Sequence, residues 1–184
     1  MNTIIDKDIN EIIPHLFISN WFTSNNLNLL KELNINAVIT VEKSKKPLQV
    51  LDYYEKNNIE FLQIPIDDFI NENIDKFFDT SYDFIDKNIS QGKNVLVHCF
   101  AGISRSSAII INYMIKNFYK TSFDSTIKEP NDVLNYILKY VQTKRNIVNP
   151  NSGFMKQLLI KATEYKNNNI FRKEELFEFF IGVF

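Results

Sequence analysis

Short apolar runs and helix-like spacings of apolar residues succeed one another along this chain. Apolar runs typical of buried strands cover residues 16–18, 37–41, 59–66 and 95–97, and Pro65 ends the third of them. Segments whose apolar residues recur every three or four positions predict helices over 26–33, 52–57, 74–89, 109–118 and 133–141. Because strand and helix patterns recur in turn, the chain is predicted to be an α/β protein.

Polar and terminal segments mark the outer parts of the predicted fold. The Gln91-Gly92 pair is expected to end the helix of 74–89. Residues 121–131 are polar and contain Pro130, so we interpret them as a surface insertion. Residues 166–184 form a C-terminal extension that is strongly apolar and aromatic. Such a segment must pack on its own domain, bind a partner or mediate self-association, and we expect the first.

The composition indicates one globular domain without a strong charge. The 184 residues are 45% hydrophobic and 14% aromatic, which suffices for one full core, so residues 1–184 are predicted to form a single domain. A net charge of -1 provides no basic surface, so neither nucleic acid nor an anionic membrane surface is an expected partner. No apolar run reaches the 18 residues of a membrane span. The composition gives no indication of the oligomeric state.

Cysteine and histidine are too few for a disulfide or a zinc cluster. Cys99 is the one cysteine, and His15 and His98 are the two histidines. We therefore expect no metal and no cofactor. A single free thiol, without a secretory signal pattern, suits a reducing cytosolic or nuclear compartment.

The candidate chemistry lies in the stretch VLVHCFAGISRSS, residues 95–107. The apolar run delivers Cys99 into a loop that ends at Arg105, and a predicted helix follows at once. If the loop amides point inward, they form a nest for a dianion at the helix N-terminus. These amides, the helix dipole and Arg105 would favour the thiolate of Cys99, which is the nucleophilic form. The alternative is that Cys99 is an ordinary buried residue at a strand end.

This stretch resembles a known signature. His98, Cys99, Gly102, Arg105 and Ser106 are similar to the signature loop of cysteine-dependent protein tyrosine phosphatases, and HCFAGISRSS resembles the dual-specificity branch. The resemblance implies a central, mostly parallel five-stranded sheet with helices on both faces, opened by a short edge hairpin. It also implies that the phosphate is bound by the loop residues Phe100, Ala101, Gly102, Ile103, Ser104 and Arg105.

The segment IPIDDF, residues 64–69, precedes the cysteine by about thirty residues and carries two adjacent carboxylates. Phosphate-ester cleavage by a thiolate needs a proton for the departing oxygen, and a carboxylic acid on a mobile loop can supply it. The family has Ile-Pro, two residues, then Asp, which aligns Asp68 with the general acid and Asp67 with a variable neighbour. The alternative is that both are solvated loop acids or a helix cap. Phe69 is expected either to wall a phenyl ring or to join the core.

A second region of resemblance follows, in which the matching residues are Arg145, Pro150, Asn151, Phe154, Gln157 and Leu158. In the family this segment packs near the signature loop. Asn151 is therefore expected to brace that loop by hydrogen bonding, and Arg145 to lie at the pocket edge, both in structural roles. Together with the acid loop, residues 64–69, these regions extend the resemblance over residues 9–165, which it defines as the catalytic core.

Together these residues predict a phosphoprotein phosphatase that acts on phosphotyrosine and on phosphoserine or phosphothreonine. Cys99 would attack phosphorus and form a phosphocysteine, while Arg105 and the loop amides bind the dianion. Asp68 would protonate the leaving oxygen and later activate water. Ser106 would stabilise the departing thiolate. His98 is expected to hold the loop rather than to transfer protons, because strand geometry points it away from Cys99.

Other functions and partners remain open from the sequence. Ile103 and Ser104 are uncharged, which favours a phosphoprotein over a phosphoinositide as substrate. A phospho-binding or scaffold protein with little turnover is the alternative from another functional class. The segment KKPLQV, with Lys45, Lys46 and the spaced Leu48 and Val50, resembles a docking site for a protein kinase of the mitogen-activated class, although such patterns often arise by chance.

Overall fold

A five-stranded sheet with the strand order β1-β2-β5-β3-β4 forms the centre of the computed structural model. The structure describes residues 8–121 and 129–181, with side chains described at 8–120 and 129–168. The strands are β1 (Ile9–Ile13), β2 (Leu16–Ser19), β3 (Ile35–Val41), β4 (Glu60–Ile64) and β5 (Asn94–His98). Only the β1-β2 pair is antiparallel, and the other neighbours are parallel. The predicted edge hairpin and mostly parallel sheet are therefore confirmed.

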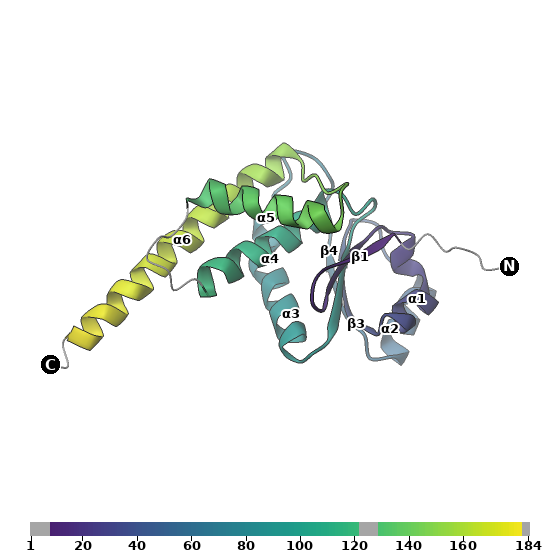
Figure 1. Cartoon of the computed structure of the whole chain (residues 1–184). Helices are drawn as coiled ribbons and strands as arrows, with labels where there is room; N and C mark the ends of the chain where they lie inside the picture. The colour runs from purple at the N-terminus through teal and green to yellow at the C-terminus, as the bar shows by residue number, and fades with distance from the viewer. Residues whose placement is uncertain (1–7, 122–128, 182–184) are drawn as a thin grey trace.

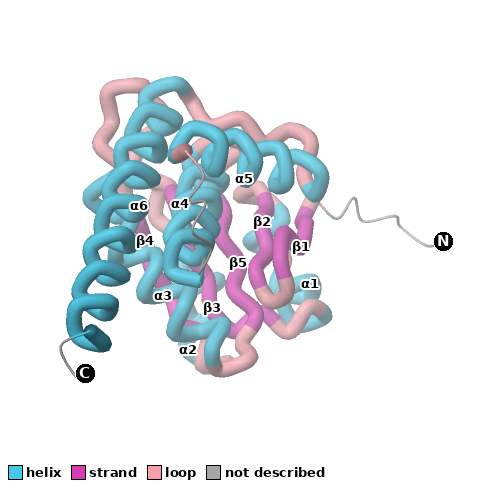
Figure 2. The backbone as a smooth tube through the Cα atoms, turned by 60° about the vertical axis from the view of Figure 1, so that its left-hand side comes forward, coloured by secondary structure: helices cyan, strands magenta, loops and turns pink. Residues whose placement is uncertain are grey.

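Helices cover both faces of this sheet (Figure 1). On one face lie α1 (Leu27–Glu32) and α2 (Leu48–Lys56). On the other lie α3 (Phe78–Ser90), α4 (Arg105–Thr121), α5 (Pro130–Lys144) and α6 (Ser152–Ile181) (Figure 2). Two short 3-10 turns, η1 (Thr23–Asn25) and η2 (Asp75–Phe77), precede α1 and α3. Among the described residues, no helix combines the length and the apolar character that crossing a bilayer requires.

The central strands are apolar on both faces because each face is covered by helices. In β5, Val95 and Val97 belong to the larger core under α3 to α6, whereas Leu96 belongs to the smaller core under α1 and α2. Side chains of successive strand residues point to opposite faces, so a continuous apolar run is what such a strand needs. This is why the run at 95–97 predicted a buried strand correctly.

Some of the predicted element boundaries differ from those in the structure. Helix α2 begins at Leu48, four residues before the predicted start, with Pro47 at its N-cap. Pro130 does not interrupt a loop: it is the first residue of α5, a position where proline's missing N–H costs nothing. The rest of the predicted insertion, residues 122–128, lies outside the described residues. The predicted exit of α3 is confirmed, with Gln91 at the C-cap and Gly92 at a φ of 72°.

The C-terminal extension continues α6 as one helix to Ile181. Its ribbon projects beyond the other elements (Figure 1). The side chains from Asn169 onward lie outside the described residues, so packing of the extension on its own domain stays a prediction.

The topology brings the candidate site residues to one edge of the sheet. Strand β5 lies between β2 and β3, with His98 paired in register with Ser19 and Thr40. All three of these strands run parallel, so their carboxyl ends meet at the same edge, where loops of open α/β sheets form binding crevices. Cys99 follows β5 directly at this edge, and Glu42 follows β3.

Candidate active site

The loop after β5 surrounds the thiol of Cys99, which is 1% exposed. The backbone N–H of Gly102 donates a hydrogen bond to Cys99 Sγ at 3.2 Å. The hydroxyl of Ser106, from the first turn of α4, donates a second one, also at 3.2 Å. The sulfur therefore has two hydrogen-bond donors directed at it, and it lies at the N-terminus of the 17-residue helix α4.

The carbonyl groups of this loop point outward and are held there. Arg145 Nε donates to Gly102 O at 2.9 Å, and its NH2 group donates to Ala101 O at 3.2 Å. The backbone N–H of Trp21 donates to Phe100 O at 2.9 Å. Because the carbonyls are engaged on the outside, the loop amides are left facing the inside, which is the arrangement of an anion-binding nest.

Arg145 therefore does not lie at the pocket edge, as the sequence had suggested. Its side chain is buried behind the loop, with 4% of its surface exposed, and it also contacts Asp8 and Asn10. A guanidinium has five N–H donors in a fixed plane, so one arginine can hold two loop carbonyls and two side chains at once. The predicted structural role is consistent with this position.

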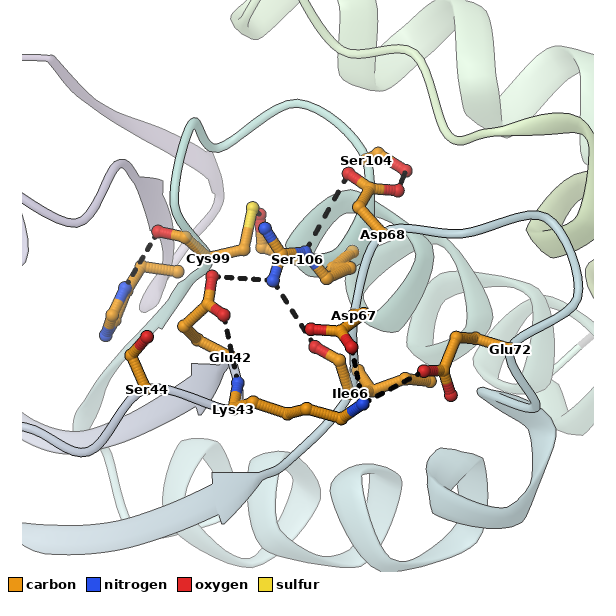
Figure 3. Close-up of polar contacts among 12 residues, drawn as sticks. Glu42, Lys43, Ser44, Ile66, Asp67, Asp68, Glu72, Cys99, Ser104 and Ser106 are labelled. Atoms are coloured by element: carbon orange, nitrogen blue, oxygen red, sulfur yellow. Dashed lines mark hydrogen bonds and ion pairs between the residues drawn. The ribbon is translucent and has the colours of Figure 1, made fainter.

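Arg105 lies at the end of the loop with an incomplete set of partners. Its NH1 group donates to Glu42 Oε2 at 2.6 Å and to Ile66 O at 3.3 Å (Figure 3). Its Nε atom is buried and has no hydrogen-bond partner among the described residues. Leaving a charged donor unpaired in a buried position is costly, so an anion that accepts from Nε would relieve this cost.

Glu42 is a site residue that the sequence interpretation missed. It is 7% exposed and follows β3 at the same edge of the sheet as Cys99. Its carboxylate orients the guanidinium of Arg105, which lies 63 residues further along the chain. The signal in the sequence was an acid directly after the apolar run of 37–41.

The two adjacent carboxylates point in different directions (Figure 3). Asp68 Oδ1 accepts hydrogen bonds from Ser104 Oγ at 2.6 Å and from Asn151 Nδ2 at 2.8 Å, while Asp68 Oδ2 lies 3.8 Å from Arg105 Nε. Asp67 instead pairs with Lys43, away from the loop. Of the two, Asp68 is the one that the structure brings to Arg105.

Asn151 joins the acid loop to the signature loop. Its side-chain amide donates to Asp68, and its backbone N–H donates to Ser104 Oγ at 3.0 Å. Its Oδ1 atom accepts from the backbone N–H of Phe154 at 3.0 Å, so the same residue caps the start of α6. The residue that caps α6 thereby also connects the loop of Asp68 with the loop of Ser104, which lie far apart in sequence.

His98 is fully buried beneath the loop and makes two hydrogen bonds. Its Nε2 lies 2.7 Å from Thr40 Oγ1, and its Nδ1 lies 3.1 Å from the carbonyl oxygen of Cys99. Burial lowers the pKa of His98 well below its ordinary value, so the ring is neutral. It contacts the backbone of Cys99 and not the sulfur, in keeping with a role in holding the loop.

The exposure of individual side chains bears on two further expectations from the sequence. Phe69 is 62% exposed, which excludes the core role that had been considered for it. Lys46 is 3% exposed, and its ammonium donates to Ser24 Oγ at 2.7 Å and to Asn25 Oδ1 at 2.8 Å. Val50 is buried as well, so neither of these side chains is accessible to a docking kinase, whereas Lys45 and Leu48 are exposed. The interpretation of KKPLQV as a kinase docking site stays a prediction.

Within 8–121 and 129–181, no group of three or more His, Cys, Asp or Glu side chains could hold a metal ion. What the loop does present is one thiol, one guanidinium with an unpaired N–H and one nearby carboxylate, a set suited to covalent chemistry on a phosphoryl group.

Comparison with known proteins agrees with this geometry. Residues 16–164 match the family model "Dual specificity phosphatase, catalytic domain". Dual specificity protein phosphatase 1 of Arabidopsis thaliana is 32% identical over 157 residues, which cover 85% of this chain and 70% of that protein. Human dual specificity protein phosphatase 9 is 32% identical over 150 residues, and the match spans only 35% of its length.

Solved structures show the same fold. The crystal structure of DUSP15 has a TM-score of 0.71 at 26% identity and covers 90% of this chain and 97% of its own. The human tyrosine phosphatase-like serine/threonine/tyrosine-interacting protein has a TM-score of 0.70 at 30% identity, with 86% and 98% covered. With its family match over residues 16–164 and its buried cysteine and arginine in one loop, the chain belongs to the dual specificity phosphatase family of cysteine-dependent phosphatases.

Proposed function

We propose that this chain hydrolyses phosphotyrosine, phosphoserine and phosphothreonine in proteins through a phosphocysteine formed on Cys99. The observation that carries the proposal is the state of Arg105. Its NH1 group is held by Glu42, while its buried Nε has no hydrogen-bond partner among the described residues and lies 3.8 Å from Asp68 Oδ2. A phosphate dianion in the loop would accept from that N–H and from the loop amides together.

In the first step, the thiolate sulfur attacks phosphorus in line with the leaving oxygen. The S–P bond forms, the P–O bond to the substrate breaks, and a proton passes to the leaving oxygen. We assign this proton to Asp68. Its Oδ1 already accepts from Ser104 and Asn151, so the proton is carried by Oδ2, the oxygen on the side of Arg105.

In the second step, water hydrolyses the phosphocysteine. The Asp68 carboxylate takes a proton from water, an O–P bond forms, and the S–P bond breaks to release inorganic phosphate. The departing sulfur regains its negative charge and needs donors at that moment. The hydroxyl of Ser106 and the N–H of Gly102, each 3.2 Å from Sγ, are suited to supply them.

Two other functions compete with this proposal. A phosphoinositide phosphatase would need further cations for the additional phosphates, whereas residues 100–104 are uncharged. The second competing function is that of a phospho-binding protein with little turnover. The same fold occurs in the human tyrosine phosphatase-like serine/threonine/tyrosine-interacting protein. The nucleophile, the arginine and a carboxylate near it are all present here, which supports turnover. The site suits a reducing compartment, cytosolic or nuclear, because a working thiolate oxidises readily.

Steady-state hydrolysis of an aryl phosphate by four proteins tests the proposal. Cys99→Ser should abolish turnover and still bind substrate, and trapping with acid should find phosphocysteine in the wild type. Asp68→Asn should lower kcat by 10²- to 10⁴-fold, the usual contribution of a general acid, and should remove the alkaline limb of the pH profile. Asp67→Asn is the matched control and should stay within a factor of about three.

Retained turnover in Cys99→Ser would overturn the mechanism. An Asp67→Asn variant as impaired as Asp68→Asn would move the acid role away from Asp68. Wild-type protein that binds phosphotyrosine peptide but releases no phosphate would favour the phospho-binding function.

A further inference from the structure

Three exposed phenylalanines lie in the segments that form the candidate site, and we call them the aromatic rim. Phe22, Phe69 and Phe100 are 70%, 62% and 55% exposed. Phe100 directly follows the nucleophile Cys99, and Phe69 directly follows Asp68. The rings of Phe22 and Phe100 contact each other edge to face, with 6.0 Å between their centroids. Large apolar side chains that are exposed beside a binding site mark a surface for a ligand.

Backbone contacts hold the segments that bear the rim. The backbone N–H of Trp21, next to Phe22, donates to the carbonyl oxygen of Phe100 at 2.9 Å, so this contact joins the two segments that bear the rings. Ile70, next to Phe69, packs against Gly153 so closely that a Cβ at position 153 would lie 1.9 Å from the Ile70 carbonyl oxygen. A preorganised apolar surface loses little conformational entropy when a ligand covers it.

The charges near the rim argue against a ligand with several phosphates. Lys43 lies on the acid-loop side of the site, and it is engaged by Asp67 and by Glu72, at 3.3 Å from the latter (Figure 3). The guanidinium of Arg105 serves a single phosphoryl group. A polyphosphorylated headgroup would therefore meet two carboxylates and a cation that is already paired.

We propose that the aromatic rim selects phosphorylated peptide segments that carry an apolar side chain immediately beside the phosphorylated residue. This inference rests on the proposed function and names its substrate class more closely. The phosphoryl group is bound by the loop of Cys99, and the neighbouring side chains must then lie over the segments that bear Phe22, Phe69 and Phe100. Apolar neighbours bury rim surface there, while charged or hydroxyl-bearing neighbours do not.

The test compares two phosphotyrosine peptides that differ only in the residues flanking phosphotyrosine, leucine in one and serine in the other. Their dissociation constants are measured with the Cys99→Ser protein, so that the result does not depend on turnover. We expect about tenfold tighter binding of the leucine peptide, the size of one partly buried side chain. Adding Phe22→Ser or Phe69→Ser should reduce this ratio to about two.

Ile160→Ser is the matched control, since Ile160 is also half exposed but lies on α6 outside the rim. It should leave the tenfold ratio unchanged. A ratio near one in Cys99→Ser, or a ratio that neither rim substitution reduces, would overturn the inference. Stronger binding of vesicles that contain a phosphoinositide than of either peptide would also overturn it. Failure of the wild type to release phosphate would count against the proposed function alone, because the binding ratio is measured without turnover.

Discussion

Replacing Gly102 by alanine tests whether the conformation of the signature loop, and not only its residues, carries the activity. Gly102 has a φ of 68°, in the left-handed region that side chains disfavour. A Cβ at this position would lie 2.6 Å from the carbonyl oxygen of Ser19 and 2.8 Å from Arg145 NH2. Real Cβ atoms do not approach so closely, so the loop backbone must move.

The protein contains its own control for the strain. Gly92 has nearly the same φ, 72°, but an added Cβ would meet nothing within 4 Å. Placing alanine in the left-handed region costs about 1–2 kcal/mol, and the reduced freedom of the unfolded chain returns about 0.4–1 kcal/mol. Gly92→Ala should therefore destabilise by roughly 1 kcal/mol, and Gly102→Ala by that amount plus the cost of the clash.

The larger effect of Gly102→Ala should be on catalysis. The N–H of Gly102 donates to Cys99 Sγ, so a shift of the loop displaces a donor of the nucleophile. A misplacement of about 1 Å can lower the rate roughly 10²-fold, and we expect kcat/KM to fall by about that factor.

Hydrolysis of an aryl phosphate and urea unfolding are measured on both variants beside the wild type. Gly92→Ala should keep kcat/KM within about twofold, since its strain lies at the exit of α3, at the opposite end of β5 from the loop. If Gly102→Ala loses no more activity than Gly92→Ala, the loop tolerates the displacement and the argument from its geometry is refuted.

Two further substitutions test buried charges. Glu42→Gln removes the charge that orients Arg105, so it should lower kcat/KM by about 10²-fold and the free energy of unfolding by roughly 1–3 kcal/mol. The control is Glu72→Gln, which loses only the contact with the exposed Lys43 and should change the free energy of unfolding by less than about 1 kcal/mol. Similar losses in both variants would contradict the role given to Glu42. Burial lowers the pKa of Lys46 from 10.5 to about 7. Between about pH 7 and pH 10.5 the unfolded chain therefore binds a proton that the folded chain does not, so the free energy of unfolding should rise with pH by at most about 1.4 kcal/mol per pH unit. Urea unfolding at pH 7 and pH 9 should show that Lys46→Met removes this rise, and a parallel pH dependence of the two proteins would refute it.

Most of the elements, and the place of the chemistry, could be predicted from the sequence because both depend on short-range patterns. The apolar run at 95–97 identified β5 since a strand covered on both faces needs such a run. Pro130 was wrongly assigned to a loop because proline occurs both in loops and at the first position of helices. Only the helix that follows it distinguishes the two.

Taken alone, the sequence determined the order of most strands and helices, with β1 and α6 as the exceptions, and it determined which loop carries the thiol and the arginine. The tertiary structure alone decided which distant groups meet that loop. Glu42 reaches Arg105 across 63 residues, Arg145 holds Gly102 across 43, and Asp68 rather than Asp67 meets Ser104 across 36. The physical reason is that periodicity reports which face of an element is buried, whereas these contacts depend on how parallel strands bring their carboxyl ends to one edge of the sheet.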